Sequence, residues 1–278
     1  MKNIIKLLFI SLLVTGCVNQ VQQKDIIKTK VLKQQEIAYI TNQREIKLPE
    51  TIKEPQEPIN QEQDLPVIKN NHLIVIDTGH QAHGNSEQEP IGPGASKTKA
   101  KVTTGATGVG TGKLESVINL EVAIKLQQKL ETSGYQVKMI RTNQDVNISN
   151  RERAMIANDS NCAAFIRLHC NSADSSSVSG TLTMAPSLNN PYCSQIAKAS
   201  YNLSKCIVDN ICSQTGSRNR GVMISDTMSG INWCTVPVTI VEMGFLSNYE
   251  EDKLLSESSY QDKIVDGIVK GINAYMEW

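Results

Sequence analysis

The stretch that decides the fold is Leu73-Ile74-Val75-Ile76-Asp77-Thr78-Gly79-His80. Its first five residues form an apolar run rich in β-branched side chains, too short for a confident helix, which predicts a buried strand. The run breaks at Thr78-Gly79 and places His80 just beyond the carboxyl end of the strand. Ligands and chemistry gather at that edge of an open α/β sheet, so His80 is a candidate metal ligand or acid–base group if other residues converge on it.

Strand and helix patterns alternate along the rest of the chain. Short apolar or alternating runs predict further strands at residues 135–141, 162–169, 180–185 and 236–245. Apolar residues at three-four spacing predict helices at residues 116–133, 150–158, 192–213 and 259–276. The buried face of the first of these helices is predicted to carry Leu120, Ala123, Ile124, Gln127 and Leu130. This alternation predicts an α/β fold with a largely parallel sheet.

The longest segment without such a pattern is the glycine-rich stretch 81–113, between the first strand and the first helix. It predicts a long loop without secondary structure, and loops of this kind are usually functional or mobile. The stretch lacks the GxxxxGK[ST] order of a phosphate loop and the setting of a dinucleotide-binding turn, which excludes a nucleotide site there. A loop of this length could cover a site at the strand edge.

The amino-terminal residues predict an export signal. Lys2 and Lys6 flank the apolar run 4–14, which ends in small residues before Cys17. The run is shorter than the roughly 20 residues that span a bilayer. It ends like a bacterial lipobox, in which the cysteine is lipidated and becomes the mature amino terminus. We therefore expect a signal peptide at 1–16, lipidation of Cys17 and an extracytoplasmic lipoprotein anchored to the cell membrane; an ordinary signal peptide or a short membrane anchor is the alternative.

Residues 17–66 predict a tether rather than a folded unit. They are rich in Gln, Lys and Glu, show no sustained apolar period, and contain four prolines that interrupt any long helix. We expect a disordered spacer between the lipid and a single catalytic domain at residues 67–278.

The net charge and the number of cysteines limit which partners and which disulfides we expect. The 28 basic and 28 acidic residues cancel, so no overall field favours nucleic acid. The six cysteines after Cys17 permit three disulfides in an exported domain, with fifteen connectivities, and none has CxxC zinc spacing. Buried free thiols are an equal alternative. These cysteines are Cys162, Cys170, Cys193, Cys206, Cys212 and Cys234.

Side chains that can bind a metal or transfer a proton lie at or just after the carboxyl ends of three predicted strands. They are His80, His169 and Glu242, and Glu115 lies where the glycine-rich stretch meets the first helix. Carboxyl ends of parallel strands share one edge, so these four groups can converge. Two histidines and one glutamate with an open fourth position form a zinc set typical of hydrolysis. The metal polarises a carbonyl and lowers the pKa of a bound water, and a further carboxylate can move the proton.

Each of these residues also has an ordinary structural interpretation. His80 or His169 alone could be a hydrogen-bonded, partly buried histidine, and Glu115 could be an acid favoured by the helix dipole. Glu242 lies inside an apolar strand, where a carboxylate is costly to bury unless it is paired or binds a metal, so a functional role is favoured. His83 could replace one ligand, but its place in the long loop argues against it.

Four motifs in order carry a family resemblance. They are residues 73–80 with the glycine-rich stretch after them, Leu114-Glu115-Ser116, residues 165–171 and residues 241–248. Together they resemble the zinc-dependent N-acetylmuramoyl-L-alanine amidases of the amidase type 3 family, over about residues 73–275. The resemblance implies a mixed, largely parallel sheet flanked by helices on both faces, one zinc ion (Zn2+), and peptidoglycan as the substrate. The bond cleaved would be the amide between N-acetylmuramic acid and L-alanine.

Carried over by position, the resemblance implies that His80, Glu115 and His169 bind the zinc. It implies that Glu242 is the catalytic carboxylate acting with a zinc-activated water, and that residues 150–154 give structural support. It indicates no substrate-binding residues. The chain departs from the family pattern in Thr78, where proline is usual, in the long loop, and in Cys170, where a small residue is common. None of these departures removes a ligand.

Two other functions fit the same motifs. A zinc peptidase acting on the stem peptides would use the same metal set with a different pocket. A non-catalytic lipoprotein that binds wall polymer and recruits another hydrolase would be expected to lack a ligand or the carboxylate, and all four are present. An activator protein is a further possible partner, because the long loop could cover the metal. No separate wall-binding repeat is present, so the lipid and tether would supply proximity to the wall.

Overall fold

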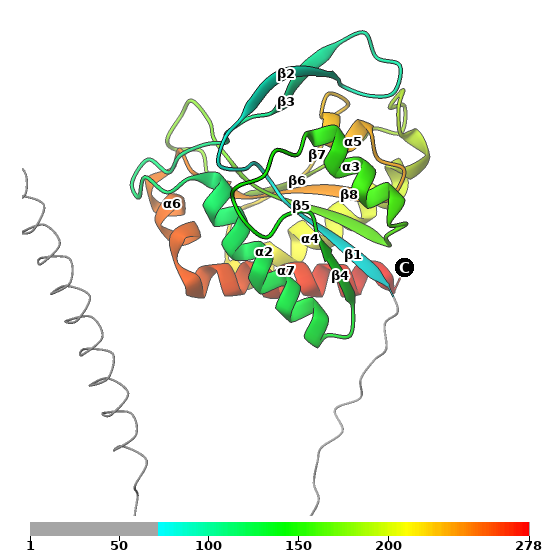
Figure 1. The fold of residues 1–278 in the computed structure, drawn as a ribbon. Helices are drawn as coiled ribbons and strands as arrows, with labels where there is room; N and C mark the ends of the chain where they lie inside the picture. Colours follow the sequence, from blue (N-terminus) through cyan, green and yellow to red (C-terminus); the bar gives the residue numbers. More distant parts are fainter. Residues whose placement is uncertain (1–71, 278) are drawn as a thin grey trace, which may run out of the picture. The chain divides into compact units, whose positions relative to one another are not determined.

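Six strands of the described residues form one mixed sheet in the order β4-β1-β5-β8-β6-β7 (Figure 1). The computed structural model describes residues 72–277, so the predicted signal peptide, Cys17 and the tether lie outside the described residues. The strands are β1 (Leu73–Thr78), β4 (Gln136–Met139), β5 (Ala164–Asn171), β6 (Thr181–Ala185), β7 (Asn219–Ile224) and β8 (Val238–Phe245). Neighbouring strands are parallel except β6 and β8. The predicted α/β class with a largely parallel sheet is confirmed.

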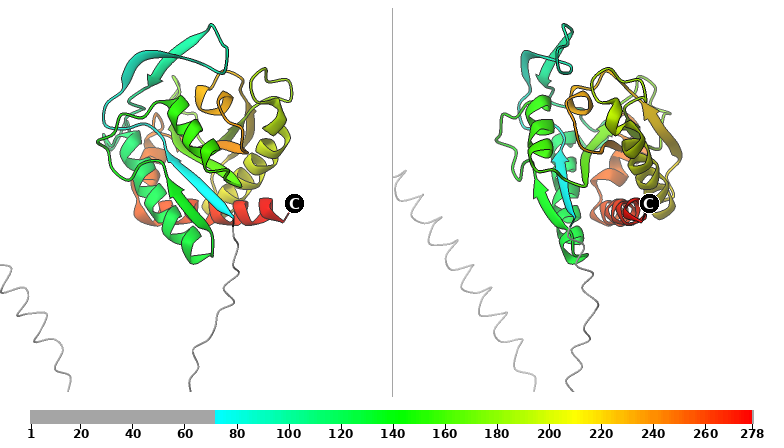
Figure 2. Two further views of the ribbon diagram at one scale, coloured as in Figure 1. Left: turned by 45° about the vertical axis from the view of Figure 1, so that its right-hand side comes forward. Right: turned by 90° about the vertical axis from the view of Figure 1, so that its right-hand side faces the viewer.

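Helices cover both faces of this sheet (Figure 1, Figure 2). One face packs against α2 (Glu115–Thr132), α4 (Ala197–Thr215) and α7 (Ser258–Met276), through strand residues such as Ile76, Leu168 and Val241. The other face, through Val75 and Phe165 among others, packs against the shorter α3 (Asn150–Asp159) and α5 (Ser229–Asn232). Side chains alternate between the faces along each strand, so each central strand has apolar residues on both sides.

The predicted buried face of α2 was partly wrong. Ala123 and Leu130 are buried as expected, but Ile124 is 40% exposed and Leu120 is only partly buried. The observed core face is spaced mainly by four residues and comprises Glu115, Ile118, Val122, Leu126 and Leu130. The helix begins with Glu115, which is itself buried, and the buried apolar residues follow from Ile118 on the same side.

Secondary structure within residues 81–113 corrects the prediction of an unstructured loop. β2 (Asn85–Pro90) and β3 (Thr98–Val102) form an antiparallel hairpin, at the top of Figure 1. The β2 sequence, Asn-Ser-Glu-Gln-Glu-Pro, has no apolar alternation, so no periodic signal marks it. Trp233 Nε1 donates to Pro90 O (2.9 Å) and Arg151 N donates to Glu89 Oε1 (3.0 Å), which ties the hairpin to the α3–α5 side.

The second half of this stretch is anchored to α6 (Tyr249–Ser256). The buried Asp252 carboxylate accepts hydrogen bonds from Gly110 N, Thr111 N and Thr111 Oγ1, each at 2.7 Å. Val109 N donates to Leu246 O at 3.0 Å. β7, α5 and α6 were not predicted, because they are short or largely polar segments.

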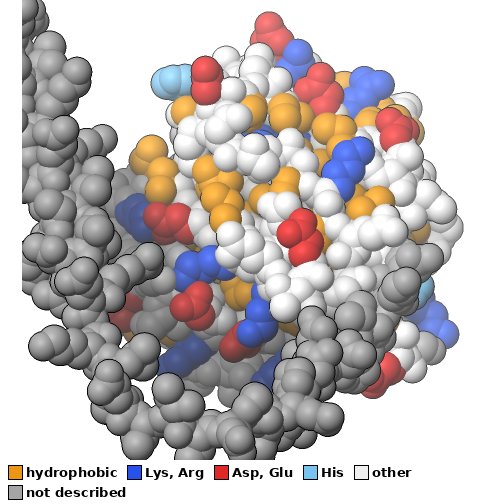
Figure 3. Space-filling view, turned by 60° about the horizontal axis from the view of Figure 1, so that its bottom comes forward, with side chains coloured by type: hydrophobic (Ala, Val, Ile, Leu, Met, Phe, Trp, Pro, Cys, Tyr) orange, Lys and Arg blue, Asp and Glu red, His pale blue; other side chains and the backbone are white. Residues whose placement is uncertain are grey.

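The cysteines and the surface complete the fold. The six cysteines of the described part are free thiols, four of them buried. Within residues 72–277 no helix is both long and apolar enough to cross a membrane. On the face in Figure 3, acidic and basic side chains are interspersed. This mixture does not form the basic stripe typical of nucleic-acid binding. Two ion pairs, Lys125–Asp262 and Lys129–Asp266, join α2 to α7.

Candidate active site

Three parallel strands bring the predicted functional residues to one edge. β5 lies between β1 and β8, and His169 is paired in register with Glu242. His80 follows β1 in the left-handed region (φ 60°), an uncommon conformation for a residue other than glycine. Glu115 opens α2 at the same edge. The sheet topology therefore brings together four residues that are widely separated in the sequence.

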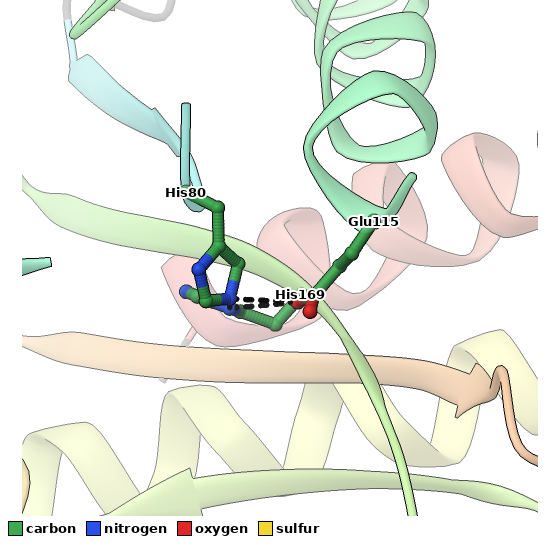
Figure 4. A group of neighbouring side chains, drawn as sticks. All are labelled: His80, Glu115 and His169. Carbon is green, nitrogen blue, oxygen red and sulfur yellow. Dashed lines mark hydrogen bonds and ion pairs between the residues drawn. The ribbon is translucent and has the colours of Figure 1, made fainter. Parts of the chain in front are cut away.

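Three donor atoms converge on one point (Figure 4). His80 Nε2 lies 3.0 Å from Glu115 Oε1, and His169 Nδ1 lies 3.1 Å from both of these atoms. The side chains come from three different elements and point toward one another. Within the described residues, this is the one group of histidine, cysteine and acidic side chains that could hold a metal ion.

Hydrogen bonds around the group orient two of the three ligands, His80 and Glu115, whereas Nε2 of the third, His169, is buried with no partner among the described residues. His80 Nδ1 lies 2.8 Å from Thr103 O, which can only accept, so Nδ1 carries a proton and Nε2 is the nitrogen that faces the metal position. Glu115 Oε1 accepts from Cys170 N (3.0 Å) and Oε2 accepts from Ala106 N (2.8 Å). Two imidazole nitrogens and one carboxylate oxygen, oriented in this way, fit a zinc ion with an open coordination position.

The charge states of the ligands agree with this fit. Burial by itself raises the pKa of Glu115, but hydrogen bonds from His169 and His80 outweigh it and hold that pKa well below its usual range. Burial lowers the pKa of His169 against the opposing effect of Glu115. At neutral pH the group therefore offers an ionised carboxylate and a neutral His169 imidazole, which are the forms that bind metals.

Two buried arginines hold the turn that carries His80. Arg141 donates through Nε to Thr78 O (2.9 Å) and His80 O (2.8 Å), and through Nη2 to Gly79 O (3.0 Å). Arg153, which is fully buried, donates through Nη1 to Thr78 O (2.9 Å) and through Nη2 to His80 O (3.1 Å). These bonds satisfy the carbonyls of a turn whose backbone conformation is strained. The supporting role predicted for residues 150–154 has this physical basis in Arg153.

Glycines leave room for the ligand side chains. A Cβ at position 79 would overlap the His169 ring. At Gly105, where φ is +85°, a Cβ would lie 2.8 Å from Glu115 Oε2 and 2.9 Å from the His80 ring. Backbone approaches the ligands closely at both positions, and glycine permits this.

Glu242 lies beside the three ligands without a partner. Its Oε2 is buried and has no hydrogen-bond partner in the part of the chain that the structure describes. Burial, followed by the charge of Glu115, raises the pKa of Glu242 to about 8. A carboxyl group with a pKa near neutrality can both accept and donate a proton under ordinary conditions.

A cavity of about 390 Å³ opens onto these groups. His80, His169 and Glu242 contribute to its wall, and the hairpin strand β3 lies along another side. Apolar side chains of β6 and β8 also line it, namely Met184 and Ile240. The cavity combines an apolar surface with a few convergent polar groups, as small-molecule sites generally do.

The sequence predictions for the site have mixed outcomes. The structure brings together His80, Glu115, His169 and Glu242, whereas His83 is exposed and outside the metal-binding group. Sequence reasoning missed Arg167, a buried cavity-lining residue of β5. The signal that singled out Glu242, a charge within an apolar strand, applies equally to Arg167 in Phe165-Ile166-Arg167-Leu168.

Comparisons with known proteins agree with the fold and the motif order. The profile of the N-acetylmuramoyl-L-alanine amidase family matches residues 74–274. The amidase LytC of Bacillus subtilis is 29% identical over 167 residues, which cover 60% of this chain and 32% of LytC. The chain therefore spans about a third of the length of that relative.

Solved structures of amidases share the architecture. The N-acetylmuramyl-L-alanine amidase Ami1 of Mycobacterium smegmatis has a TM-score of 0.68 at 21% identity, covering 74% of this chain and 97% of Ami1. The CwlD amidase of Clostridioides difficile, solved in complex with the GerS lipoprotein, has a TM-score of 0.60 at 26% identity, covering 74% and 99%. With a family profile that spans nearly all described residues, the chain belongs to the N-acetylmuramoyl-L-alanine amidase family.

Proposed function

We propose that this protein is a zinc-dependent peptidoglycan amidase. It hydrolyses the amide between the lactyl group of N-acetylmuramic acid and the L-alanine of the stem peptide. The observation that carries the proposal is the convergence of His80 Nε2, Glu115 Oε1 and His169 Nδ1 beside a buried carboxyl group without a partner. Family membership supports the same reaction.

His80, Glu115 and His169 would hold the zinc, which when bound polarises the scissile carbonyl and acidifies a water molecule. The chain supplies the proton transfers. Glu242 Oε2 takes the proton of the attacking water and delivers it to the alanine nitrogen as the C–N bond breaks. Its raised pKa suits both steps, because the group is neither a strong acid nor a strong base near pH 8. The products are a lactyl carboxylate on the glycan and a stem peptide with a free amino terminus.

Supporting residues keep the ligands in place while the substrate binds. Thr103 O orients His80, and the amides of Ala106 and Cys170 orient Glu115. Partners of this kind commonly affect metal affinity by about 10-fold to 100-fold when removed. Because the ligands are already oriented, little reorganisation is needed on metal binding.

Product analysis tests the proposed reaction. Purified protein with a measured zinc content is incubated with peptidoglycan, and the soluble products are identified by mass spectrometry. Free stem peptides together with intact glycan support the amidase. Cleavage within the stems would instead identify a zinc peptidase, and zinc-loaded protein without any product would indicate a wall-binding protein.

We further propose that the protein is an extracytoplasmic lipoprotein, with a signal peptide at residues 1–16, lipid on Cys17 and a tether to residue 66. The support is the lipobox-like end of the apolar run. An activator protein is a further proposed partner, since CwlD of C. difficile was solved in complex with the GerS lipoprotein. Cys17→Ser should move the protein out of the membrane fraction and abolish incorporation of a labelled fatty acid; unchanged labelling would exclude Cys17 as the lipidated residue.

A further inference from the structure

A buried guanidinium faces the cavity and has no role in the proton transfers. The Arg167 side chain is only 3% exposed. Its Nε donates to Asp77 Oδ2 and its Nη2 donates to Asn150 Oδ1, both at 2.8 Å. For Nη1, no acceptor is present among residues 72–277, and a Cβ on Gly230 of α5 would overlap it. Arg167 and Gly230 both line the cavity.

The buried charges around Arg167 do not balance. Asp77 is fully buried and pairs with both Arg153 (2.7 Å) and Arg167 (2.8 Å), so two guanidinium charges share one carboxylate. Burial opposes ionisation of Asp77, but these two arginines hold its pKa well below the usual range. An excess buried cation is costly unless an anion accompanies it. Arg167, which lines the cavity, is the member of this cluster that can meet an anion from outside.

A second cation lines the same cavity. Lys99 belongs to the hairpin strand β3 and is partly buried. No hydrogen-bond or ion-pair partner for its ammonium group occurs in the described chain. Burial, followed by the charge of Lys97, lowers the pKa of Lys99, as expected for an ammonium group that lacks a counter-ion. The cavity therefore has cationic groups on both the sheet and the hairpin.

Arg167 lies at a distance from the metal ligands that can be compared with the distance between two groups of the substrate. Arg167 and His169 are two residues apart on the same face of β5, so their Cα atoms are roughly 7 Å apart. In a stem peptide, the α-carboxyl group of the second residue lies two residues, or roughly 7 Å in an extended chain, from the carbonyl attached to the first. This span is similar to the Cα spacing of His169 and Arg167, so an extended peptide that runs along β5 from the metal position brings this carboxylate to the level of Arg167.

We propose that Arg167 Nη1 and Lys99 Nζ form a carboxylate subsite for the second residue of the stem peptide, a D-glutamate with a free α-carboxyl group. The inference rests on the proposed amidase function and adds a determinant of substrate specificity to it. Arg167 and Lys99 are substrate-positioning residues, since they bind the peptide and take no part in the proton transfers. The anion completes the charge balance of the Asp77 cluster when substrate is bound.

The test compares two muropeptides that differ only in this carboxyl group, which is free in one and amidated in the other. For the unmodified, zinc-loaded protein, kcat/KM for the free acid should exceed that for the amide by on the order of 10-fold to 100-fold. Lys99→Gln should reduce this ratio and leaves the Asp77 cluster intact. Arg167→Lys keeps the charge but loses the guanidinium geometry, and it should reduce the ratio further. Lys263→Gln is the matched control, because Lys263 is exposed on α7 and outside the cavity lining, and it should keep the ratio.

A binding measurement separates the subsite from the reaction. Calorimetry with the dipeptide L-alanyl-D-glutamate and its α-amide should give tighter binding of the acid, with a smaller difference in Lys99→Gln. Equal cleavage and equal binding of the acid and amide forms would overturn the subsite and leave the amidase standing. Preferential binding of the acid without hydrolysis of either muropeptide would support the subsite and overturn the proposed reaction.

Discussion

The three predicted ligands and the predicted catalytic carboxylate, Glu242, differ in how they are held. His80 and Glu115 have hydrogen-bond partners outside the metal-binding group, and the backbone beneath His80 is held by two arginines. Oε2 of Glu242, adjacent to them on β8, is buried with no partner among the described residues. His80 and Glu115 are therefore oriented before any metal arrives, whereas Glu242 Oε2, like Nε2 of His169, has no partner among the described residues.

This difference follows from what each role requires. A metal ligand gains from fixed geometry and a fixed protonation state, because both raise affinity. A group that must take and return a proton gains from a pKa near the working pH, which a salt bridge or several donors would lower. Four measurements test this difference between the metal ligands and Glu242.

The largest effect is expected from removing a ligand charge. Glu115→Gln keeps the shape of the side chain but loses the anionic oxygen that His80 and His169 approach, so bound zinc and activity should both fall to background. Elemental analysis and the muropeptide assay measure the two quantities. Glu131→Gln, at an exposed position of the same helix, is the control. A full zinc content in Glu115→Gln would remove this residue from the ligand set.

Glu242→Gln should lower the rate of hydrolysis without lowering the zinc content. We expect kcat to fall by about 10²-fold to 10⁴-fold, the usual range for a lost general acid–base group, while zinc content stays that of the unmodified protein. Full activity would exclude Glu242 as the proton carrier. Loss of zinc would instead place Glu242 among the ligands, and the distinction between the ligands and the proton carrier would fail.

Arg153→Met tests whether the turn that carries His80 depends on buried charge. The change leaves Asp77 with one arginine partner and removes one of the two arginine hydrogen bonds to each of the Thr78 and His80 carbonyls, so metal-free protein should lose about 3–5 kcal/mol of unfolding free energy. Urea unfolding measures the loss. Arg151→Met, on the exposed side of α3 where Arg151 stacks on Trp233, should cost less than about 1 kcal/mol. Equal losses in the two variants would show that the buried cluster is not what holds the His80 turn.

The last prediction is a pH dependence of stability in the metal-free protein. The pKa of folded Glu242 is raised to about 8 from an ordinary 4.5, so the folded state holds a proton that the unfolded state releases. Its contribution is therefore most favourable below pH 4.5 and is lost as the pH rises toward 8. The melting temperature of the unmodified protein should fall relative to that of Glu242→Gln across this window. A difference independent of pH would contradict the raised pKa.

The residues at the carboxyl ends of the strands were predicted better than the hairpin and the helix that surround them. Apolar runs that end in His80 and His169 carry a strong local signal, and topology then made their meeting foreseeable. The hairpin at 85–102 was missed because β2 is almost entirely polar and pairs without burying an apolar face. The core face of α2 was misplaced because apolar residues occur on two sides of the helix, so that Ile118, Val122 and Leu126 compete with Leu120 and Ile124 for the buried side.

Polar contacts between residues far apart in the sequence could not be predicted either. Arg153 and Asp77 are 76 positions apart, and Asp252 and Thr111 are 141 apart. No periodicity marks such pairs, since each forms only after several elements have packed. The imbalance of buried charge at Arg167 became visible only when its partners were known.

The hydrogen bonds to Asp252 also limit when, during synthesis of the chain, the metal site can form. The loop that leads into Glu115 is held by a carboxylate more than a hundred residues downstream, on α6. A nascent chain has therefore produced all three predicted ligands before it contains the group that holds this loop. Only a chain that extends through α6 can offer the ligands in their final arrangement, so metal loading is expected to follow synthesis of α6 rather than that of the ligands themselves.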